Sequence, residues 1–302
     1  MFDHVKVTAA ISSCVRAIFK VNQKIGDYKS IYLKMQRLHM RSQCFALFYG
    51  CVRDTKFYLF RGRRKSLKRI TSKEFYLEIM MEHIVDELLE RTSLSRANLI
   101  YLGGGHSYIL LPNTKEIRLV VDAYEKEINK WLRETFDIDL YIACGYVPVS
   151  ANTLRNEPKG SYENMYMTVS RILSQKKAHR YDADMIRELN HQTYEGEREC
   201  KVCHRVKKIT DDKCPICNAL EKTGATIMYA DCFTILSEPE ENALPLPNNR
   251  YLVIESRKAL EDHMQAPSYV RSYMKNDLYT GKHVTNKLWL EITCRRSPKN
   301  TF

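Results

Sequence analysis

The sequence contains no apolar stretch of 18 residues without a charge, and no charged segment followed by an apolar run opens it. Neither a membrane-spanning helix nor a secretion signal is therefore indicated, and we expect a cytoplasmic protein. The Walker phosphate loop, the Gly-x-Ser-x-Gly elbow and the His-Glu-x-x-His zinc site are missing too. We find no internal repeat and no low-complexity segment. These absences predict a chain without catalytic residues that act by themselves.

Basic residues exceed acidic ones in this chain of 302 residues. Lys and Arg number 48 and Asp and Glu number 36, which gives a formal net charge of +12. Such an excess attracts polyanions such as nucleic acids. Much of it lies in the run RGRRKSLK at 61–68, which could contact phosphates or could form a solvated face.

Four of the ten cysteines have paired spacing: Cys200-x-x-Cys203 and, ten residues later, Cys214-x-x-Cys217. Each pair can bind one tetrahedral zinc ion through two thiolates. A complete set of four sulfurs leaves no position for water, so the pattern predicts a structural zinc ion. The alternative is free thiols or a disulfide. His204 is adjacent and could substitute for one sulfur.

The hydrophobic pattern of the first half predicts an α+β fold. Apolar residues recur at helical or strand spacing in the order strand, helix, strand, strand, helix, strand. The predicted elements after an amphipathic helix at 3–19 are strand 45–50, helix 72–91 with Ser72 as its cap, strands 98–102 and 107–111, helix 114–136 and strand 140–147. This order is typical of the ferredoxin-like split βαβ arrangement, with two helices on one face of an antiparallel sheet.

The second half changes in character. Residues 155–195 are predicted to be mostly helical and charged, and the cysteine segment follows. Short strands are expected from Gly224 onward, with a Pro- and Asn-rich break at 244–249 before a strand at 251–255. We therefore expect a helical segment followed by a zinc lobe with short strands.

Gly103, Gly104, Gly105 and His106 separate the two central strands. Nucleotidyl cyclase and polymerase palms place acidic residues at this turn to hold two metal ions, and here the carboxylates are missing. The glycines could let a phosphate or base approach the backbone, with His106 donating a hydrogen bond. Equally, the glycines could simply form the turn.

Asp3 and His4 form a dipeptide that can belong to a metal-dependent phosphohydrolase site. That site needs further His and Asp ligands from other helices, and none precede this dipeptide. A solvated helix start is the simpler interpretation.

Five segments carry a family resemblance: FDHVKVTAAISSC at 2–14, SRANLIYLGGGHSYILLPNT at 95–114, CKVCHR and CPICNALEKTG within 200–224, ENALPLPNNRYLV at 241–253 and LYTGKHVTNKLW at 278–289. In content and order they resemble the large, cyclase-like subunit of the type III-A CRISPR-associated (Csm) interference complex.

The resemblance implies three regions. Residues 1–20 would be the last helix of an HD domain, with Asp3 matching the final Asp of its motif; residues 21–155 a degenerate first palm; and residues 156–302 a helical linker with a zinc-binding domain. The second palm, with its Gly-Gly-Asp-Asp motif, would follow. The expected protein is therefore an incomplete large subunit without the family's two catalytic centres, the single-stranded DNase and the cyclic oligoadenylate synthase.

The resemblance also implies cofactors and partners. Gly103 to His106 would lie near one of two ATP molecules, bound with a divalent metal only if a second palm completes the site. The expected partners are other Csm subunits, CRISPR RNA (crRNA) and target RNA indirectly, and single-stranded DNA in the intact family, but no membrane.

Two other functions stay open: a zinc-stabilised RNA-binding or adaptor module, and one half of a split cyclic oligoadenylate synthase. The family continues its first strand with Gly-Asp-Ile-Ser-Gly-Ile-Gln-x-Phe, whereas this chain has GCVRDTKF at 50–57. We hypothesise a shifted reading frame there and again at 290–293. A shift at the first place would make the basic run at 61–68 accidental.

Overall fold

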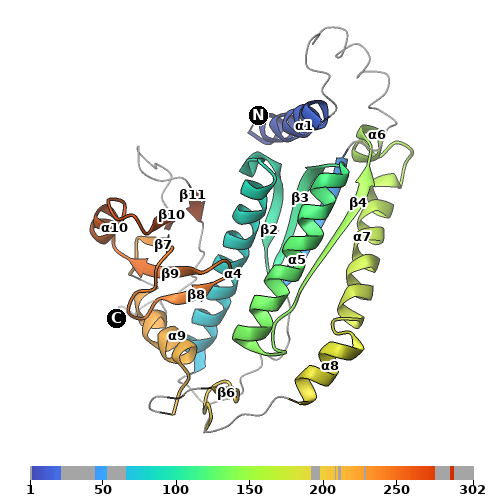
Figure 1. Ribbon diagram of the computed structural model, residues 1–302. Coiled ribbons are helices and arrows are strands. Elements are labelled where there is room, and N and C mark those ends of the chain that lie inside the picture. The colour runs from blue at the N-terminus through green and yellow to red at the C-terminus, as the bar shows by residue number, and fades with distance from the viewer. Residues whose placement is uncertain are drawn as a thin grey trace, which may run out of the picture. The chain divides into compact units, whose positions relative to one another are not determined.

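The computed structural model describes residues 2–21, 45–52, 66–191, 198–207, 209, 212–227, 229–275 and 286–288. The chain forms two units, each with helices and strands (Figure 1). The first comprises Met1–Leu59 and Phe75–Tyr194, and the second comprises Phe60–Glu74 and Glu195–Phe302. The predicted mixture of helix and strand is confirmed.

Four antiparallel strands form the sheet of the first unit. They are β1 (Phe45–Val52), β2 (Leu99–Gly103), β3 (His106–Pro112) and β4 (Ile142–Val149), in the spatial order β2-β3-β1-β4. Helix α4 (Ser66–Arg91) lies between β1 and β2 in the sequence, and helix α5 (Lys115–Phe136) lies between β3 and β4. The succession strand, helix, strand, strand, helix, strand is as predicted.

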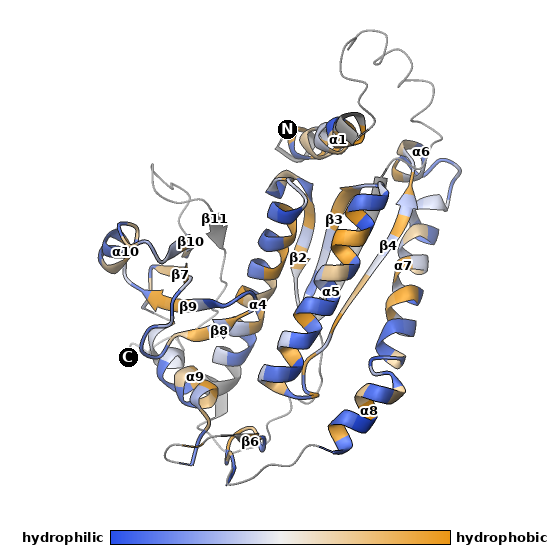
Figure 2. Cartoon of the chain, in the orientation of Figure 1, coloured by the Kyte–Doolittle hydropathy of each residue, from blue (hydrophilic) through white to orange (hydrophobic). Residues whose placement is uncertain are grey.

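Helix α5 begins where the sequence predicts because Thr114 caps it. The Thr114 hydroxyl accepts a hydrogen bond from the backbone N–H of Ile117 at 3.3 Å, which satisfies one of the free amides of the first turn. Apolar residues at helical spacing form its buried stripe, and Figure 2 shows hydrophobic and hydrophilic patches alternating along the helix. Tyr124 donates a hydrogen bond to the Ile84 carbonyl, which joins α5 to α4.

Helix α4 begins earlier than predicted. Ser72 was expected to be its cap, but the helix starts at Ser66 and Ser72 lies buried inside it. Neither glycine nor proline interrupts residues 66–72, so nothing in the local sequence stops the helix from extending. Several of its charged residues are buried as well, among them Glu82 and Asp86, which Arg96 contacts at 2.5 and 2.9 Å.

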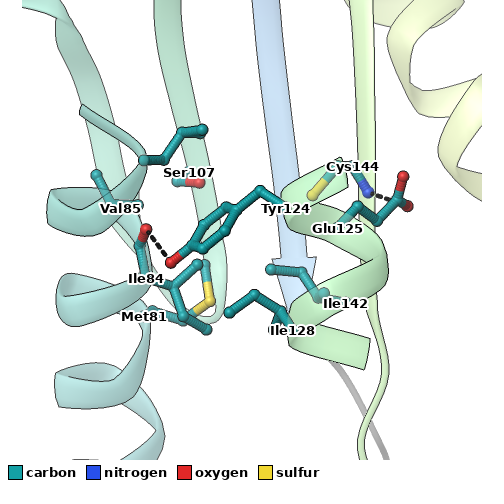
Figure 3. A pocket seen from close by; sticks show the side chains of 10 residues that line it. Met81, Ile84, Val85, Ser107, Tyr124, Glu125, Ile128, Ile142 and Cys144 are labelled. Atoms are coloured by element: carbon teal, nitrogen blue, oxygen red, sulfur yellow. Dashed lines mark hydrogen bonds between the residues drawn. The ribbon is translucent and has the colours of Figure 1, made fainter. Parts of the chain in front are cut away.

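A small cavity of about 10 Å³ remains between α4, α5 and the sheet (Figure 3). Its walls include Met81, Leu88, Ile128 and Cys144. A water molecule needs at least about 10–15 Å³ and several polar partners, so this cavity is a packing gap in an apolar core rather than a ligand site.

Helices α1 (Phe2–Val21) and α7 (Ser161–Ala178) pack on residues of β3 and β4. Ala10 and Cys14 of α1 share a buried cluster with Leu110, Val149 and Met165. Two short helices, α6 (Ala151–Leu154) and α8 (Ala183–Asn190), flank α7 in sequence. The prediction that residues 155–195 are mostly helical is thus confirmed for the described part.

The second unit contains a five-stranded sheet in the order β11-β10-β7-β9-β8. Its elements are β5 (Arg198–Glu199), β6 (Val206–Lys207), α9 (Pro215–Thr226), β7 (Cys232–Leu236), β8 (Leu244–Leu246), β9 (Arg250–Glu255), α10 (Arg257–His263), β10 (Tyr269–Lys275) and β11 (Asn286–Leu288). The break predicted at 244–249 is only partly right. Leu244–Leu246 pairs with β9 as a strand, and the turn is confined to the residues after it, where Asn248 and Asn249 have positive φ.

Some predictions lie outside the described residues. They are the part of the first proposed frame shift (50–57) that follows Val52, the second at 290–293, and most of the basic run at 61–68. Among the residues that are described, no helix is both long and apolar enough to cross a membrane.

Candidate functional site

The first cysteine pair lies in the turn between β5 and β6. The backbone N–H of Cys200 donates to the Arg205 carbonyl at 3.0 Å, and the N–H of His204 donates to the Cys200 carbonyl at 2.8 Å. His204 has a positive φ of 59°, which reverses the chain after Cys203. Both sulfurs are thereby turned to the same side of a tight loop.

The second pair lies at the start of α9. Cys214 is the N-cap residue, Pro215 occupies the first turn, and Cys217 follows within that turn. Proline suits this place because its fixed φ fits a helix. It also lacks a backbone N–H, which at this position would have no acceptor within the helix. The first turn of a helix carries a partial positive charge, which favours thiolates over thiols.

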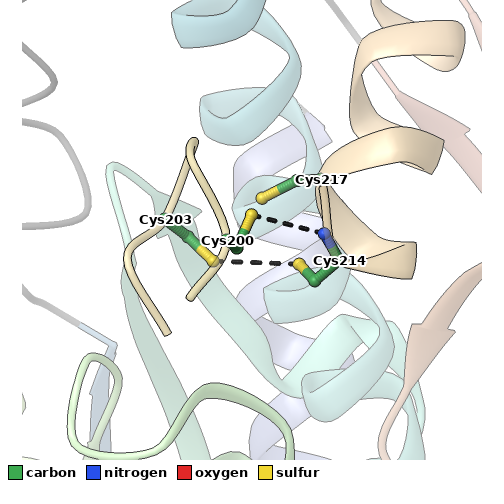
Figure 4. Close-up of side chains that lie close together, drawn as sticks. All are labelled: Cys200, Cys203, Cys214 and Cys217. Carbon is green, nitrogen blue, oxygen red and sulfur yellow. Dashed lines mark hydrogen bonds between the residues drawn. The ribbon is translucent and has the colours of Figure 1, made fainter. Parts of the chain in front are cut away.

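These two segments bring all four sulfurs together (Figure 4). The Sγ atoms of Cys200, Cys203, Cys214 and Cys217 lie within 4.8 Å of one another, and those of Cys203 and Cys214 are 3.8 Å apart. That separation is too long for a disulfide. Four sulfurs about 2.3 Å from a common zinc ion lie about 3.8 Å from each other, so the donor set fits a tetrahedral site.

Hydrogen bonds and burial shape the chemistry of the cluster. The backbone N–H groups of Val202 and Cys214 point at the Cys200 sulfur, at 3.4 and 3.3 Å. Hydrogen bonds from the Cys214 and Cys217 thiols lower the pKa of Cys203 far below its ordinary value. The hydrogen bond with Cys203 raises the pKa of Cys214 to about 11, and the hydrogen bonds with Cys203 and Cys214 raise the pKa of Cys217. Negative charge thus concentrates on one sulfur unless a cation allows all four to ionise.

His204 is not part of this group. Its Nδ1 atom lies 2.7 Å from a carboxylate oxygen of Glu199, and its side chain is largely exposed. Within the described residues, the four cysteines form the one cluster of three or more candidate metal ligands. The alternative in which His204 replaces a sulfur is therefore not supported by the geometry.

The glycine hairpin is the second predicted site. Its turn consists of Gly104 and Gly105, with φ of +57° and +71°, a region that other residues rarely occupy. Gly103 and His106, which we placed in the turn, pair with each other as the last residue of β2 and the first residue of β3. His106 Nδ1 lies 2.7 Å from the Gly104 carbonyl oxygen. Because that oxygen can only accept, Nδ1 carries the proton.

The predicted residues are not all gathered in one place. Asp3 lies on α1, the hairpin lies at the end of the first sheet, and the cysteines belong to the second unit. Asn98, which no sequence pattern singled out, is fully buried and contacts both α1 and β3. Its amide donates to the Leu110 carbonyl at 2.9 Å and accepts from the Ser13 hydroxyl at 2.8 Å. A lone Asn before a strand gives no periodic signal, so only tertiary contacts reveal it.

The fold and the cluster define a protein that combines a helix-covered antiparallel sheet with a separate four-cysteine lobe. A family model described as Csm1 subunit domain B matches residues 62–192. The single-strand-specific deoxyribonuclease Cas10/Csm1 of subtype III-A from Mycobacterium tuberculosis is 37% identical over 309 residues, covering 96% of this chain and 38% of its own length. Its counterpart from Enterococcus italicus is 33% identical, with the same coverage of 96% and 38%.

Solved structures agree on the fold. A crystal structure of a Csm1–Csm4 cassette in complex with pppApA matches with a TM-score of 0.69 and 19% identity, over 96% of this chain and 34% of that chain. A cassette in complex with cA3 matches with a TM-score of 0.64 and 19% identity, again over 96% and 34%. The chain belongs to the Cas10/Csm1 family of type III-A CRISPR systems. It spans 38% of the length of the two curated relatives.

Proposed function

We propose that this chain is the zinc-stabilised, nucleotide-facing part of a Csm1-type large subunit in a type III-A CRISPR effector in the cytoplasm. The observation that carries the proposal is the match of 96% of the chain to curated relatives at 37% and 33% identity. Those relatives are named as single-strand-specific deoxyribonucleases, and solved neighbours are cassettes in complex with ATP or cA3. The chain itself supplies neither the DNase nor the synthase centre in this proposal.

The first sheet with α4 and α5 is, in this proposal, a ferredoxin-like palm. The antiparallel order β4-β1-β3-β2, with one helix after the first strand and one after the third, supports it. Residues 1–20 would be the last helix of an HD domain, with Asp3 as a motif remnant. Residues 21–155 form the palm, and residues 156–302 form the linker and zinc-binding region.

Cys200, Cys203, Cys214 and Cys217 would hold one zinc ion, since sulfur-only tetrahedral sets favour zinc. Bound zinc would cross-link the β5–β6 turn to the start of α9 and would leave no position for a reacting water. The residues around it, Val202, Ile209 and Ile216, give the lobe only a small apolar cluster. The role of the ion is therefore structural.

The hairpin would face one ATP molecule, with a divalent metal provided when a second palm completes the site. A Cβ atom at Gly104 would meet no atom within 4 Å, so the space above this backbone is open to a phosphate. The chain offers no carboxylate within Gly103–His106, which suits binding rather than catalysis. Expected partners are a Csm4-type subunit, with crRNA and target RNA contacted through the complex.

The test is purification of the full chain, metal analysis, and incubation with a Csm4-type subunit, ATP and Mg²⁺. The expected result is one zinc per chain, a stable complex and no oligoadenylate. The same assay with the polypeptide encoded immediately downstream distinguishes a non-catalytic subunit part from one half of a split synthase. Oligoadenylate formed only in that mixture identifies the split synthase. Oligoadenylate made by the chain alone, or failure to bind a Csm4-type subunit, would contradict the proposal.

A further inference from the structure

Four tyrosines form a row of rings beside the glycine hairpin. Tyr101 of β2 and Tyr108 of β3 are cross-strand partners whose ring centroids are 6.2 Å apart. Tyr108 meets Tyr166 of α7 edge to face at 5.2 Å, and Tyr166 meets Tyr162 at 5.1 Å. A hydrogen bond of 3.2 Å joins the hydroxyls of the last two. The row thus links the hairpin strands to α7.

Strand register places Tyr101 and Tyr108 on the same face of the sheet as Gly103 and His106, which flank the turn. Tyr101 pairs with Tyr108 and Gly103 pairs with His106, and residues two apart in a strand share a face. A Cβ atom at Gly103 would lie 3.0 Å from the Tyr101 hydroxyl oxygen. The ring of Tyr101 therefore extends along β2 toward the turn, and its hydroxyl occupies the place of a Gly103 side chain.

Tyr101 is the most exposed of these four tyrosines and the one next to the hairpin turn. The residue is 52% exposed, whereas Tyr108, against which it packs, is only partly accessible. An exposed ring that packs against a second ring is a surface suited to a flat aromatic group.

We propose that the base of the nucleotide at the hairpin stacks on Tyr101, with Tyr108 and Tyr166 as positioning residues that hold the ring. The inference rests on the proposed nucleotide site and adds the group that recognises the base. Glycine at 103 lets the ring lie along the strand, and the open backbone of Gly104 lies on the phosphate side. Stacking on one aromatic side chain changes affinity by about 5- to 150-fold.

The test measures binding of ATP and of inorganic tripolyphosphate, with Mg²⁺, to the full chain mixed with the polypeptide that supplies a second palm, by calorimetry or ligand-observed NMR. Tripolyphosphate keeps the phosphates and lacks the base. The variants are Tyr101→Ala, which removes the ring, and Tyr101→Phe, which keeps it. Tyr229→Ala is the matched control, because Tyr229 is 88% exposed and belongs to the second unit.

We expect Tyr101→Ala to weaken ATP binding at least about fivefold while leaving tripolyphosphate binding unchanged, and Tyr101→Phe and Tyr229→Ala to resemble the natural chain. ATP binding that is equal in the natural chain and in Tyr101→Ala would overturn the stacking role and leave the nucleotide site in place. Absence of ATP binding to the natural chain would overturn both. An equal loss of ATP and tripolyphosphate affinity would show a folding defect or phosphate contact instead, and would also overturn stacking.

Discussion

The four-cysteine lobe and the sheet of the first unit are stabilised by different means. In the lobe, four sulfurs within 4.8 Å of one another are surrounded by three partly buried apolar residues. In the first unit, α4 and α5 bury long apolar stripes, which include Tyr76, Ile79, Ile128 and Phe136. Burial of apolar area alone can hold the second arrangement, whereas we expect a lobe with so small a core to depend on the proposed zinc ion. Metal removal and core mutation should therefore separate the two regions.

Loss of one zinc ligand should have the largest effect. Cys203→Ser removes a sulfur from the set, and we expect the loss of the bound zinc and unfolding of the segment from β5 to the first turn of α9. Zinc binding contributes about 10–16 kcal/mol to the folding of small zinc domains, which is more than the small apolar cluster of the lobe can replace. Metal analysis measures the loss of zinc, and limited proteolysis within residues 198–217 measures the unfolding of the segment.

Cys232→Ala is the matched control for that substitution. Cys232 is buried too but lies in β7, outside the sulfur cluster, and burial raises the pKa of its thiol to about 12. Zinc content should stay at one per chain in this variant. A Cys203→Ser protein that retained zinc and showed the natural proteolysis pattern would contradict the metal dependence of the lobe.

A core truncation in the first unit should come next in size. Ile128→Ala enlarges the small cavity between α4 and α5, and replacements of this kind cost about 2–5 kcal/mol. Thermal unfolding should shift to lower temperature while zinc content stays unchanged. Leu119→Ala on the same helix, where the side chain is 58% exposed, should change the free energy of unfolding by less than about 0.5 kcal/mol. Equal shifts for the two variants would refute the assigned packing.

Removal of the Asn98 amide should have a moderate effect that is local. The side chain bridges Ser13 of α1 and the Leu110 carbonyl of β3, and unpaired buried groups cost about 1–3 kcal/mol each. We expect Asn98→Ala to increase hydrogen exchange in α1 while α5 keeps its protection. Asn190→Ala, at the exposed end of α8, serves as the control. Unchanged exchange in α1 would show that Asn98 does not hold this helix.

The smallest effect is expected at His263, where Glu255 lies 2.5 Å from Nδ1 and Glu240 lies 2.8 Å from Nε2. Burial acts to lower the pKa of His263, but the hydrogen bonds to Glu240 and Glu255 outweigh it and raise the pKa above its ordinary value. The resulting stability is fully present below the unfolded pKa of about 6.5 and is lost as pH rises through the folded pKa.

The natural chain should therefore exceed His263→Gln in stability most at about pH 6, by up to about 1 kcal/mol, and least at about pH 9. Thermal melting of both proteins across this range isolates the contribution of His263 from that of the cysteines, because the cysteines are common to both. A difference that stayed constant with pH would exclude the titration of His263 as its cause.

Local signals predicted much of the first unit. Apolar spacing predicted a helix over 114–136, and α5 begins at Lys115 because the hydroxyl of Thr114 caps it, a role that a hydroxyl before an amphipathic run can fill. Ser72 carried the same signal but lies inside α4, because the residues before it continue the helix. Leu244–Leu246 carries a proline, which indicated a break, yet its place at the edge of the sheet tolerates that residue. Where a helix starts or a strand is interrupted therefore depends on residues outside the short stretch of sequence that carries the signal.

The sequence by itself determined the composition of the cysteine set and the place of the glycine turn, because metal ligands and positive φ angles require particular residue types at fixed spacing. The tertiary structure alone decided which groups meet. It excluded His204 from the sulfur cluster, paired His106 with Gly103, placed Asn98 between α1 and β3, and set the ring of Tyr101 beside the turn. Contacts between residues far apart in the chain depend on packing geometry, and a local pattern does not encode that geometry.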